Sequence, residues 1–228
     1  MRLDTKRHFH FGVNFIVSPS PDPAQLNVLQ FQQHLASPAR GIVFDQTQRQ
    51  GEAVVLGRTS PALEVRIGSI GPQVGQLLVT SSRPEGRIED FIADAEELVA
   101  AYQQVWPQVN QVLRRDCTIR HLYASGEEHA FKYLWEKRLH QPESALNTFG
   151  RPIAGGGIRL VFPALTAEQP LIELKIESLL VDASELFVEA GMVWNQPVSG
   201  DHMNAPELLM TVEEFLNSQV AKFIAEDK

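Results

Sequence analysis

The fold is decided by two stretches that echo each other, PALEVRIGSI at residues 61–70 and PLIELKIESL at residues 170–179. Both alternate apolar and polar side chains, a period of two that is typical of a strand with one buried face. Internal repetition of this kind indicates two copies of one supersecondary unit that share a core. Four of the ten aligned positions are identical, namely Pro61/Pro170, Glu64/Glu173, Ile67/Ile176 and Ser69/Ser178.

The segments around these two stretches follow the same order. In each half we expect a strand, a short helix, three strands and a long helix. Apolar side chains at helical spacing mark the long helices, and Gly and Pro separate the strands. The expected ranges are strand 7–17, helix 23–36, strands 52–58, 62–70 and 74–81 and helix 87–106 in the first half, then strand 113–124, helix 127–139, strands 157–163, 171–180 and 185–195 and helix 206–226 in the second.

The repeat predicts an α+β fold, a tandem pseudo-repeat of strand-helix-three strands-helix that forms an antiparallel sheet with the long helices on one face. The sheet should be antiparallel because the connections between strands are too short for parallel crossovers. We expect two halves, residues 1–112 and 113–228, packed as one structural domain. One side of the echoed strands should face the two amphipathic helices, with Leu63, Val65, Ile67, Ile172, Leu174 and Ile176.

The composition favours a folded protein and argues against some partners. Of the 228 residues, 43% are hydrophobic and 21% are charged, which permits a buried core. The net charge of -8 argues against nucleic acid, whose phosphates require clustered Lys and Arg. No stretch approaches the roughly 18 apolar residues of a membrane helix, and the first residues lack an apolar signal core. We therefore expect a cytoplasmic protein that binds neither nucleic acid nor membrane.

The side of the strands that faces away from the helices is polar and mixed in charge. It should carry Glu64, Arg66, Arg120, Glu173 and Lys175. An acid followed two positions later by a base recurs in both echoed stretches. Such a face is either solvated, with ion pairs between neighbouring strands, or it is a surface that binds a protein or peptide.

Two histidines in the first strand are the candidate metal ligands. The alternation in RHFHFGVNFIV (7–17) places His8 and His10 on one face, about 7 Å apart along the strand, so that both could bind one ion. If the first strands of the two halves pair, Asp116 could supply a third ligand. The alternative is a pair of solvated histidines. We predict no other cofactor.

No residue pattern defines a catalytic centre. Cys117 and His121 lie four positions apart on an expected strand, about 13 Å between their backbones, too far for a nucleophile and its base. Cys117 is instead expected in the core. No Gly-x-Ser-x-Gly or His-Glu-x-x-His pattern occurs.

Three segments give the chain a resemblance to a known family, namely RHFHFGVNFIV (7–17), RRDCTIRHLY (114–123) and LLMTVEEFLNSQVAKFI (208–224). With the order of the elements, they resemble a sporadically distributed bacterial family of unknown function, although the first strand lacks the acidic residues expected there. The duplicated layout is also similar to the TATA-binding-protein-like architecture. The resemblance implies a duplicated sheet-plus-helix fold and supplies no catalytic residue.

The sequence favours a non-enzymatic binding or protein-interaction module that uses the polar sheet face or an exposed edge strand. Two alternatives stay open. One is a metal-dependent enzyme or metal-binding protein centred on His8 and His10. The other binds a small molecule between the sheet and a long helix. The sequence leaves homo-oligomerisation open.

Overall fold

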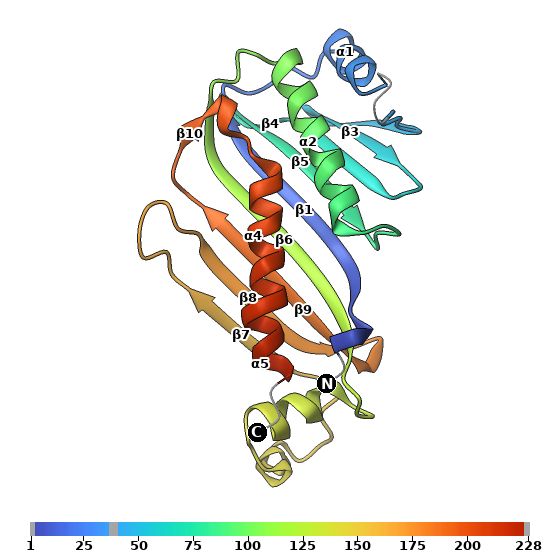
Figure 1. Cartoon of the computed structure of the whole chain (residues 1–228), viewed down its shortest axis with the longest axis vertical. Helices are drawn as coiled ribbons and strands as arrows, with labels where there is room; N and C mark the ends of the chain where they lie inside the picture. Colours follow the sequence, from blue (N-terminus) through green and yellow to red (C-terminus); the bar gives the residue numbers. More distant parts are fainter. Residues whose placement is uncertain (1–2, 37–40, 226–228) are drawn as a thin grey trace.

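The first strands of the two halves, β1 (Arg7–Ser18) and β6 (Gln111–Ala124), lie side by side and antiparallel at the centre of one large sheet (Figure 1). The computed structural model describes residues 3–36 and 41–225. Within these residues the sheet has ten strands, in the order β2-β3-β4-β5-β1-β6-β9-β8-β7, with β10 paired to β6. The strand pairs are antiparallel. The predicted α+β fold with an antiparallel sheet is confirmed.

The other elements have the following bounds. The strands are β2 (Gln46–Gln50), β3 (Ala53–Arg58), β4 (Leu63–Gly71), β5 (Val74–Ser82), β7 (Gly157–Phe162), β8 (Leu171–Leu179), β9 (Asp182–Trp194) and β10 (Val198–Ser199). The α-helices are α1 (Gln25–Leu35), α2 (Ile88–Val105), α3 (Ala130–Lys132), α4 (Ala205–Phe215) and α5 (Ala221–Ala225). Short π-helices span Tyr133–Arg138 and Leu216–Val220, and 3-10 helices span Leu3–Thr5, Glu143–Phe149 and Gly200–His202.

The strand order reads the same outward from the centre in both directions. β5, β4 and β3 follow β1 on one side, and β9, β8 and β7 follow β6 on the other. A long helix, α2 or α4, then closes each set, so the predicted tandem repeat is present in the topology. Two strands depart from the prediction, because β2 and β10 have no place in the expected order. β2 reads QTQRQ and is exposed throughout, so it lacks the apolar alternation by which a strand is predicted.

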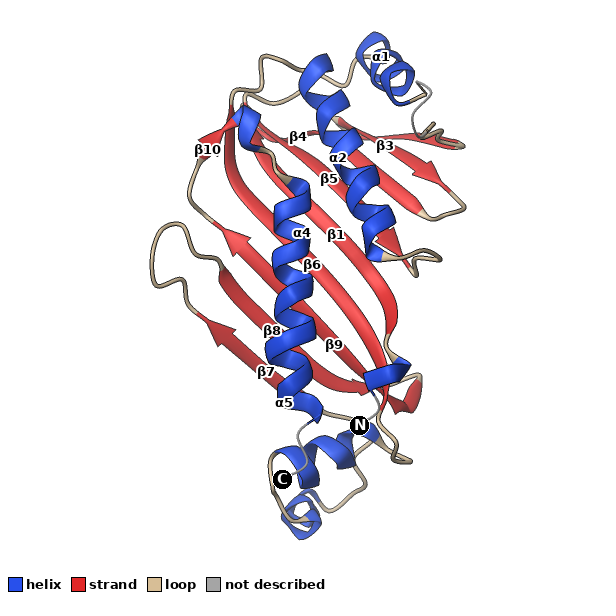
Figure 2. Ribbon diagram, in the orientation of Figure 1, coloured by secondary structure: helices blue, strands red, loops and turns tan. Residues whose placement is uncertain are grey.

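The long helices cover one face of the sheet, as predicted (Figure 2). Beneath them, Ile67 of β4 and Ile176 of β8 are fully buried at matching places in the echoed strands. Both belong to one continuous hydrophobic cluster that contains side chains from both halves and from the helices. The two halves therefore share one core.

The last long helix begins close to its predicted start and then changes its hydrogen-bond pattern. Asn204 caps α4, because its Oδ1 accepts a hydrogen bond from the Glu207 N–H at 3.2 Å. α4 continues into the π-helix Leu216–Val220 and then α5, and residue 226 of the predicted helix lies outside the described residues. No helix in the described part of the chain has the length and apolar character needed to cross a lipid bilayer.

Because one core joins both halves, we expect a single cooperative unfolding transition and similar losses at matching positions. Ile67→Ala and Ile176→Ala each remove a fully buried side chain and should lower the free energy of unfolding by about 2–5 kcal/mol. Chemical denaturation followed by circular dichroism measures both. Ile70→Ala is the control, because Ile70 is 49% exposed on the same strand as Ile67. Two separate transitions would contradict the shared core.

Candidate functional site

A β-bulge separates the two histidines of the first strand. His8 lies opposite His121 of β6, whereas His10 lies opposite Arg120, so β1 has one extra residue between them. His8 thereby turns toward the helices, where its ring centroid lies 5.0 Å from that of the buried Phe11. His10 stays on the open face. The prediction that His8 and His10 share one face is therefore wrong, because the bulge breaks the alternation between them.

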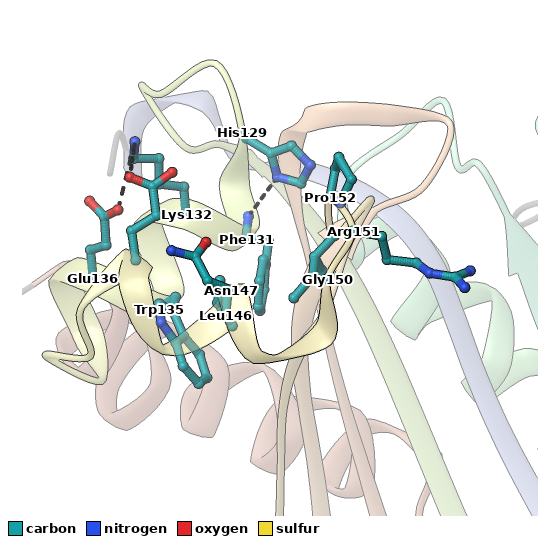
Figure 3. A pocket seen from close by; sticks show the side chains of 12 residues that line it. His129, Phe131, Lys132, Trp135, Glu136, Leu146, Asn147, Gly150, Arg151 and Pro152 are labelled. Atoms are coloured by element: carbon teal, nitrogen blue, oxygen red, sulfur yellow. Dashed lines mark hydrogen bonds and ion pairs between the residues drawn. The ribbon is translucent and has the colours of Figure 1, made fainter.

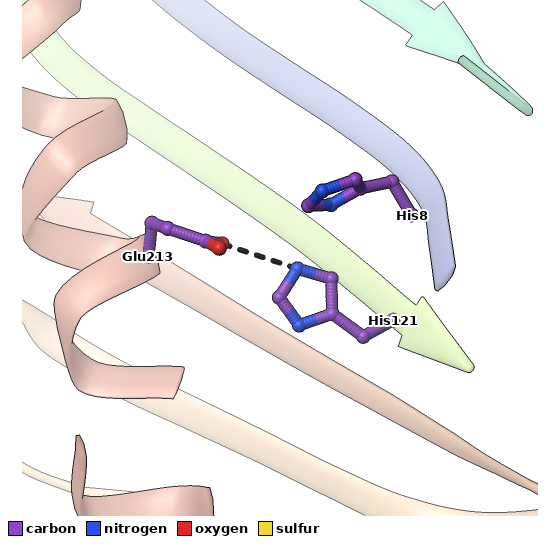
Figure 4. A group of neighbouring side chains, drawn as sticks. All are labelled: His8, His121 and Glu213. Atoms are coloured by element: carbon purple, nitrogen blue, oxygen red, sulfur yellow. Dashed lines mark ion pairs between the residues drawn. The ribbon is translucent and has the colours of Figure 1, made fainter. Parts of the chain in front are cut away.

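His8 instead meets His121 and Glu213 (Figure 4). One ring nitrogen of each histidine and one carboxylate oxygen of Glu213 lie within 4.8 Å of one another. His121 Nε2 is 3.1 Å from Glu213 Oε2, and the two histidine rings meet edge to face with centroids 5.1 Å apart. Side chains from β1, β6 and α4 thus bring two nitrogen donors and one oxygen donor to one place.

Each of these three side chains has a buried polar atom without a hydrogen-bond partner. Among the described residues the unpartnered atoms include His8 Nδ1, His121 Nε2 and Glu213 Oε2. His121 Nε2 and Glu213 Oε2 face each other at 3.1 Å and form an ion pair when His121 is protonated, so of the three atoms only His8 Nδ1 has neither a hydrogen bond nor an ion pair. Nearly all buried polar atoms in native proteins have partners. The unpartnered His8 nitrogen beside this buried pair indicates a place where a ligand would complete the interactions.

The Glu213 carboxylate is oriented by two neighbours. Lys6 Nζ donates to Glu213 Oε1 at 2.7 Å, and Asn217 Nδ2 donates to the same oxygen at 2.9 Å. Oε2 is left facing His121. Burial would raise the pKa of Glu213, but the adjacent His121 and Lys6 outweigh burial and lower this pKa to about 2. The carboxylate is therefore ionised at neutral pH.

The two histidines can present lone pairs to the same place. His121 Nδ1 lies 3.3 Å from the Tyr123 hydroxyl, so with an ion bound the tautomer protonated on Nδ1 would donate to Tyr123 and Nε2 would turn its lone pair from the Glu213 ion pair to the ion. Burial, assisted by His121 and Lys6, lowers the pKa of His8 to about 4. His8 is thus neutral at pH 7. Neutral imidazole and ionised carboxylate are the forms that bind metal ions.

Asp116, the third ligand predicted for His8, lies elsewhere. The pairing of β1 with β6 places Asp116 opposite Asn14, whose Nδ2 donates to Asp116 Oδ2 at 2.8 Å. Arg114 Nε donates to Asp116 Oδ1 at 2.7 Å. The prediction of this ligand is wrong, because the strand register that sets Asn14 opposite Asp116 sets His121 opposite His8.

His121 and Glu213 are the partners that sequence reasoning missed. One usable signal exists, since both central strands contain an Arg-His pair, Arg7-His8 and Arg120-His121. Glu213 offers a weaker signal, because it lies four residues after Leu209 and is buried with it in α4, and an acid at helical spacing within an apolar stripe is a departure from the amphipathic pattern.

On the open face, most of the predicted binding residues pair with one another or with neighbours. Glu189 of β9 accepts hydrogen bonds from Arg120 Nε at 2.5 Å and from Lys175 Nζ at 2.6 Å. Lys175 also lies 3.3 Å from Glu173, which accepts a hydrogen bond from Arg159 at 2.9 Å. These side chains form a chain of alternating charge across β6, β9, β8 and β7.

The predicted binding residues of the first half are arranged differently. Glu64 is exposed, and Arg66 is partly buried. Within the part of the chain that the structure describes, Arg66 Nε has no hydrogen-bond partner. An acid and a base therefore recur in both echoed strands. Glu173 and Lys175 of the second half belong to the chain of ion pairs that includes Glu189, whereas Glu64 and Arg66 of the first half are not part of it.

Two cavities lie apart from the His8–His121–Glu213 cluster. One, of about 570 Å³, lies between α2 and the start of α4 and is lined by Arg115 of β6 and by Glu207. This is where a small molecule between the sheet and a long helix, as considered from the sequence, would fit. The other, of about 510 Å³, is lined by Phe131, Trp135 and Leu146 near the π-helix Tyr133–Arg138 (Figure 3).

Comparison with known proteins identifies no family for the chain. No protein-family model matches it, and no curated protein matches its sequence. The chain has a remote structural likeness to BexL, a di-domain ARO/CYC protein from the BE-7585A biosynthetic pathway. The identity is 12%, the alignment covers 96% of this chain and 99% of that one, and the TM-score is 0.25. A TM-score this low supports no conclusion about fold or function.

Glu189 joins the ion-pair chain on the open face, so its loss should destabilise the protein in a pH-dependent way. Burial would raise the pKa of Glu189, but hydrogen bonds from Lys175 and Arg120 outweigh burial and lower this pKa below its usual value. A carboxyl group with a lowered folded-state pKa stabilises the fold above its unfolded pKa, and this contribution is lost as the pH falls through the folded pKa. Glu189→Gln should therefore lower the free energy of unfolding at pH 7 by about 1–3 kcal/mol, and by less at about pH 3.

Denaturant titrations of both proteins at the two pH values measure this difference. Glu177→Gln is the matched control, because Glu177 is exposed on the neighbouring strand β8 and its loss should change stability by no more than about 0.5 kcal/mol. An equal loss for Glu189→Gln at both pH values would contradict the role given to the charge.

Proposed function

We propose that this protein binds one divalent transition-metal ion of the zinc class through His8, His121 and Glu213. The observation that supports the proposal is that three elements bring two imidazoles and a carboxylate to one place, where His121 and Glu213 form a buried ion pair and His8 Nδ1 has no hydrogen-bond partner. A polar network with a purely structural role would be expected to satisfy its own buried atoms. A metal ion would bind all three side chains at once.

The donor set fits the chemistry of zinc. Zinc binds imidazole nitrogen and carboxylate oxygen at about 2.0–2.2 Å in tetrahedral geometry, so its ligand atoms lie about 3.3 Å apart. The ligand atoms here lie within 4.8 Å of one another, so binding an ion would require the side chains to move closer together. Magnesium and calcium favour sites made of oxygen atoms, so a site with two imidazoles should discriminate against them.

Three protein ligands would leave one tetrahedral position for water. Structural zinc sites usually have four protein ligands, whereas catalytic sites have three and keep the fourth position open. On this proposal the protein is a metal-binding protein with an open coordination position. Its ion would also connect β1, β6 and α4, so that metal binding would strengthen the attachment of the last long helix to the two central strands.

Zinc titration of the metal-free protein tests the proposal. Calorimetry should show one equivalent bound, and zinc should raise the midpoint of thermal unfolding, because a ligand that binds the native state stabilises it. His8→Gln removes a ligand at a partly exposed position, and Glu213→Gln keeps the shape of the side chain but removes its charge. Each should lower zinc affinity at least about tenfold.

His10→Gln is the matched control for this titration. His10 is close to His8 on the same strand but on the opposite face, so its loss should leave zinc affinity unchanged. Magnesium in large excess should not displace zinc. Absence of zinc binding in the wild-type protein would contradict the proposal, as would an equal loss of affinity in His8→Gln and His10→Gln.

A second candidate function is the protein or peptide binding considered for the open sheet face. Arg66 favours it, because its side chain is partly exposed, its Nε has no hydrogen-bond partner among the described residues, and a guanidinium is a good donor for a carboxylate. An acidic peptide is the matching partner. A partner captured by wild-type protein and by Arg66→Lys, but not by Arg66→Glu, would support this function. Binding that is the same for all three proteins would contradict it.

A further inference from the structure

β7, the outermost strand of the second half, has a free edge (Figure 1). Its counterpart β3 lies equally far from the centre of the sheet but is covered by β2. No strand among the described residues lies beyond β7. Because alternate residues of an antiparallel edge strand direct their N–H and C=O groups outward, β7 has a row of backbone groups that another strand could pair.

The two outer edges of the sheet differ in chemistry. β2 reads QTQRQ and has no apolar residue, and it carries Arg49, a charge of the kind that opposes association at a strand edge. β7 reads GIRLVF, with Val161 55% exposed and Phe162 41% exposed. Its charged residue, Arg159, is already paired with Glu173 at 2.9 Å. An apolar, uncovered strand edge favours the addition of a further strand.

We propose that β7 pairs antiparallel with β7 of a second copy of this chain, with Leu160 opposite Leu160, so that the two sheets become one. In this register Ile158 lies opposite Phe162 of the second copy, and Arg159 lies opposite Val161 of the second copy. The contact is self-complementary, as a twofold interface requires.

The helix side of β7 favours this register. Ile158 and Leu160 pack against the hydrophobic core but remain partly exposed. Phe162 contacts Phe215, with ring centroids 6.2 Å apart. In the proposed dimer each of these apolar side chains gains an apolar neighbour across the new strand pair, which is the unit of stabilisation in a sheet.

The open side of β7 selects between neighbouring registers. With Leu160 at the centre, Arg159 meets the uncharged Val161. A register centred on Arg159 would place two guanidinium groups directly opposite each other, and like charges in that position are destabilising. Registers centred on Ile158 or Val161 avoid this contact too, but they pair only three residues of β7 across the interface, whereas the register centred on Leu160 pairs five.

Two substitutions at Val161 test both the dimer and its register. A lysine there would repel Arg159 of the second copy, and a glutamate would attract it. Because two symmetric pairs form, Val161→Lys should weaken the dimer and Val161→Glu should tighten it, each by about 2- to 30-fold. Sedimentation velocity over a concentration series measures the dissociation constants.

Within one chain, the two substitutions at Val161 should change the stability of the monomer in the direction opposite to their effect on the dimer. A change in association can therefore be distinguished from a change in folding. Val161 lies opposite Glu173 of β8, so lysine should stabilise the monomer and glutamate should destabilise it. Gln48→Lys adds the same charge to the edge strand β2 and should leave association unchanged. A wild-type protein that stays monomeric at all concentrations overturns the proposal. A dimer that both Val161 variants change in the same direction, or leave unchanged, also overturns it, as does one that Gln48→Lys disrupts.

Discussion

The backbone hydrogen bonds between β1 and β6 join the two halves of the protein, and the register of that pairing determines which side chains meet. In each half the other strands lie outward from this pair, and the long helix covers the same face of the sheet as the long helix of the other half. The register sets His121 opposite His8 and Asp116 opposite Asn14. A shift by one residue would exchange the two faces along the strand, so the core and the histidine pair depend on the same set of hydrogen bonds.

The bulge in β1 shows how a small irregularity positions chemistry. One extra residue moves His8 from the open face to the boundary between sheet and helix, where Glu213 of α4 reaches it. Burying charged and polar groups there costs desolvation energy, and apolar residues of similar volume would often pack as stably. Packing of α4 against the sheet therefore does not by itself require this cluster, which is why we assign it a binding role.

Much of the fold could be predicted from the sequence, because alternation and helical spacing depend on local residues. The buried sides of the echoed strands and the places of both long helices follow from such patterns. β2 was missed because its polar residues carry no alternation, and the bulge was missed because a period of two cannot reveal one inserted residue. His8 was recognised as a ligand candidate, but its partners depend on long-range register and on the packing of α4, which local patterns do not encode. The partner of the protein and its cytoplasmic location stay predictions.

The contact between Lys6 and Glu213 joins positions 207 residues apart in the sequence. Lys6 lies just before β1, and Glu213 lies on the last long helix. The ion pair therefore connects the first strand of the first half to the long helix of the second half. The entropic cost of closing so long a loop grows only with the logarithm of its length. Most of this cost is already met by the pairing of the strands that lie between Lys6 and Glu213 in the sequence. Fraying of either element breaks this ion pair, so the pair adds to the local stability of both.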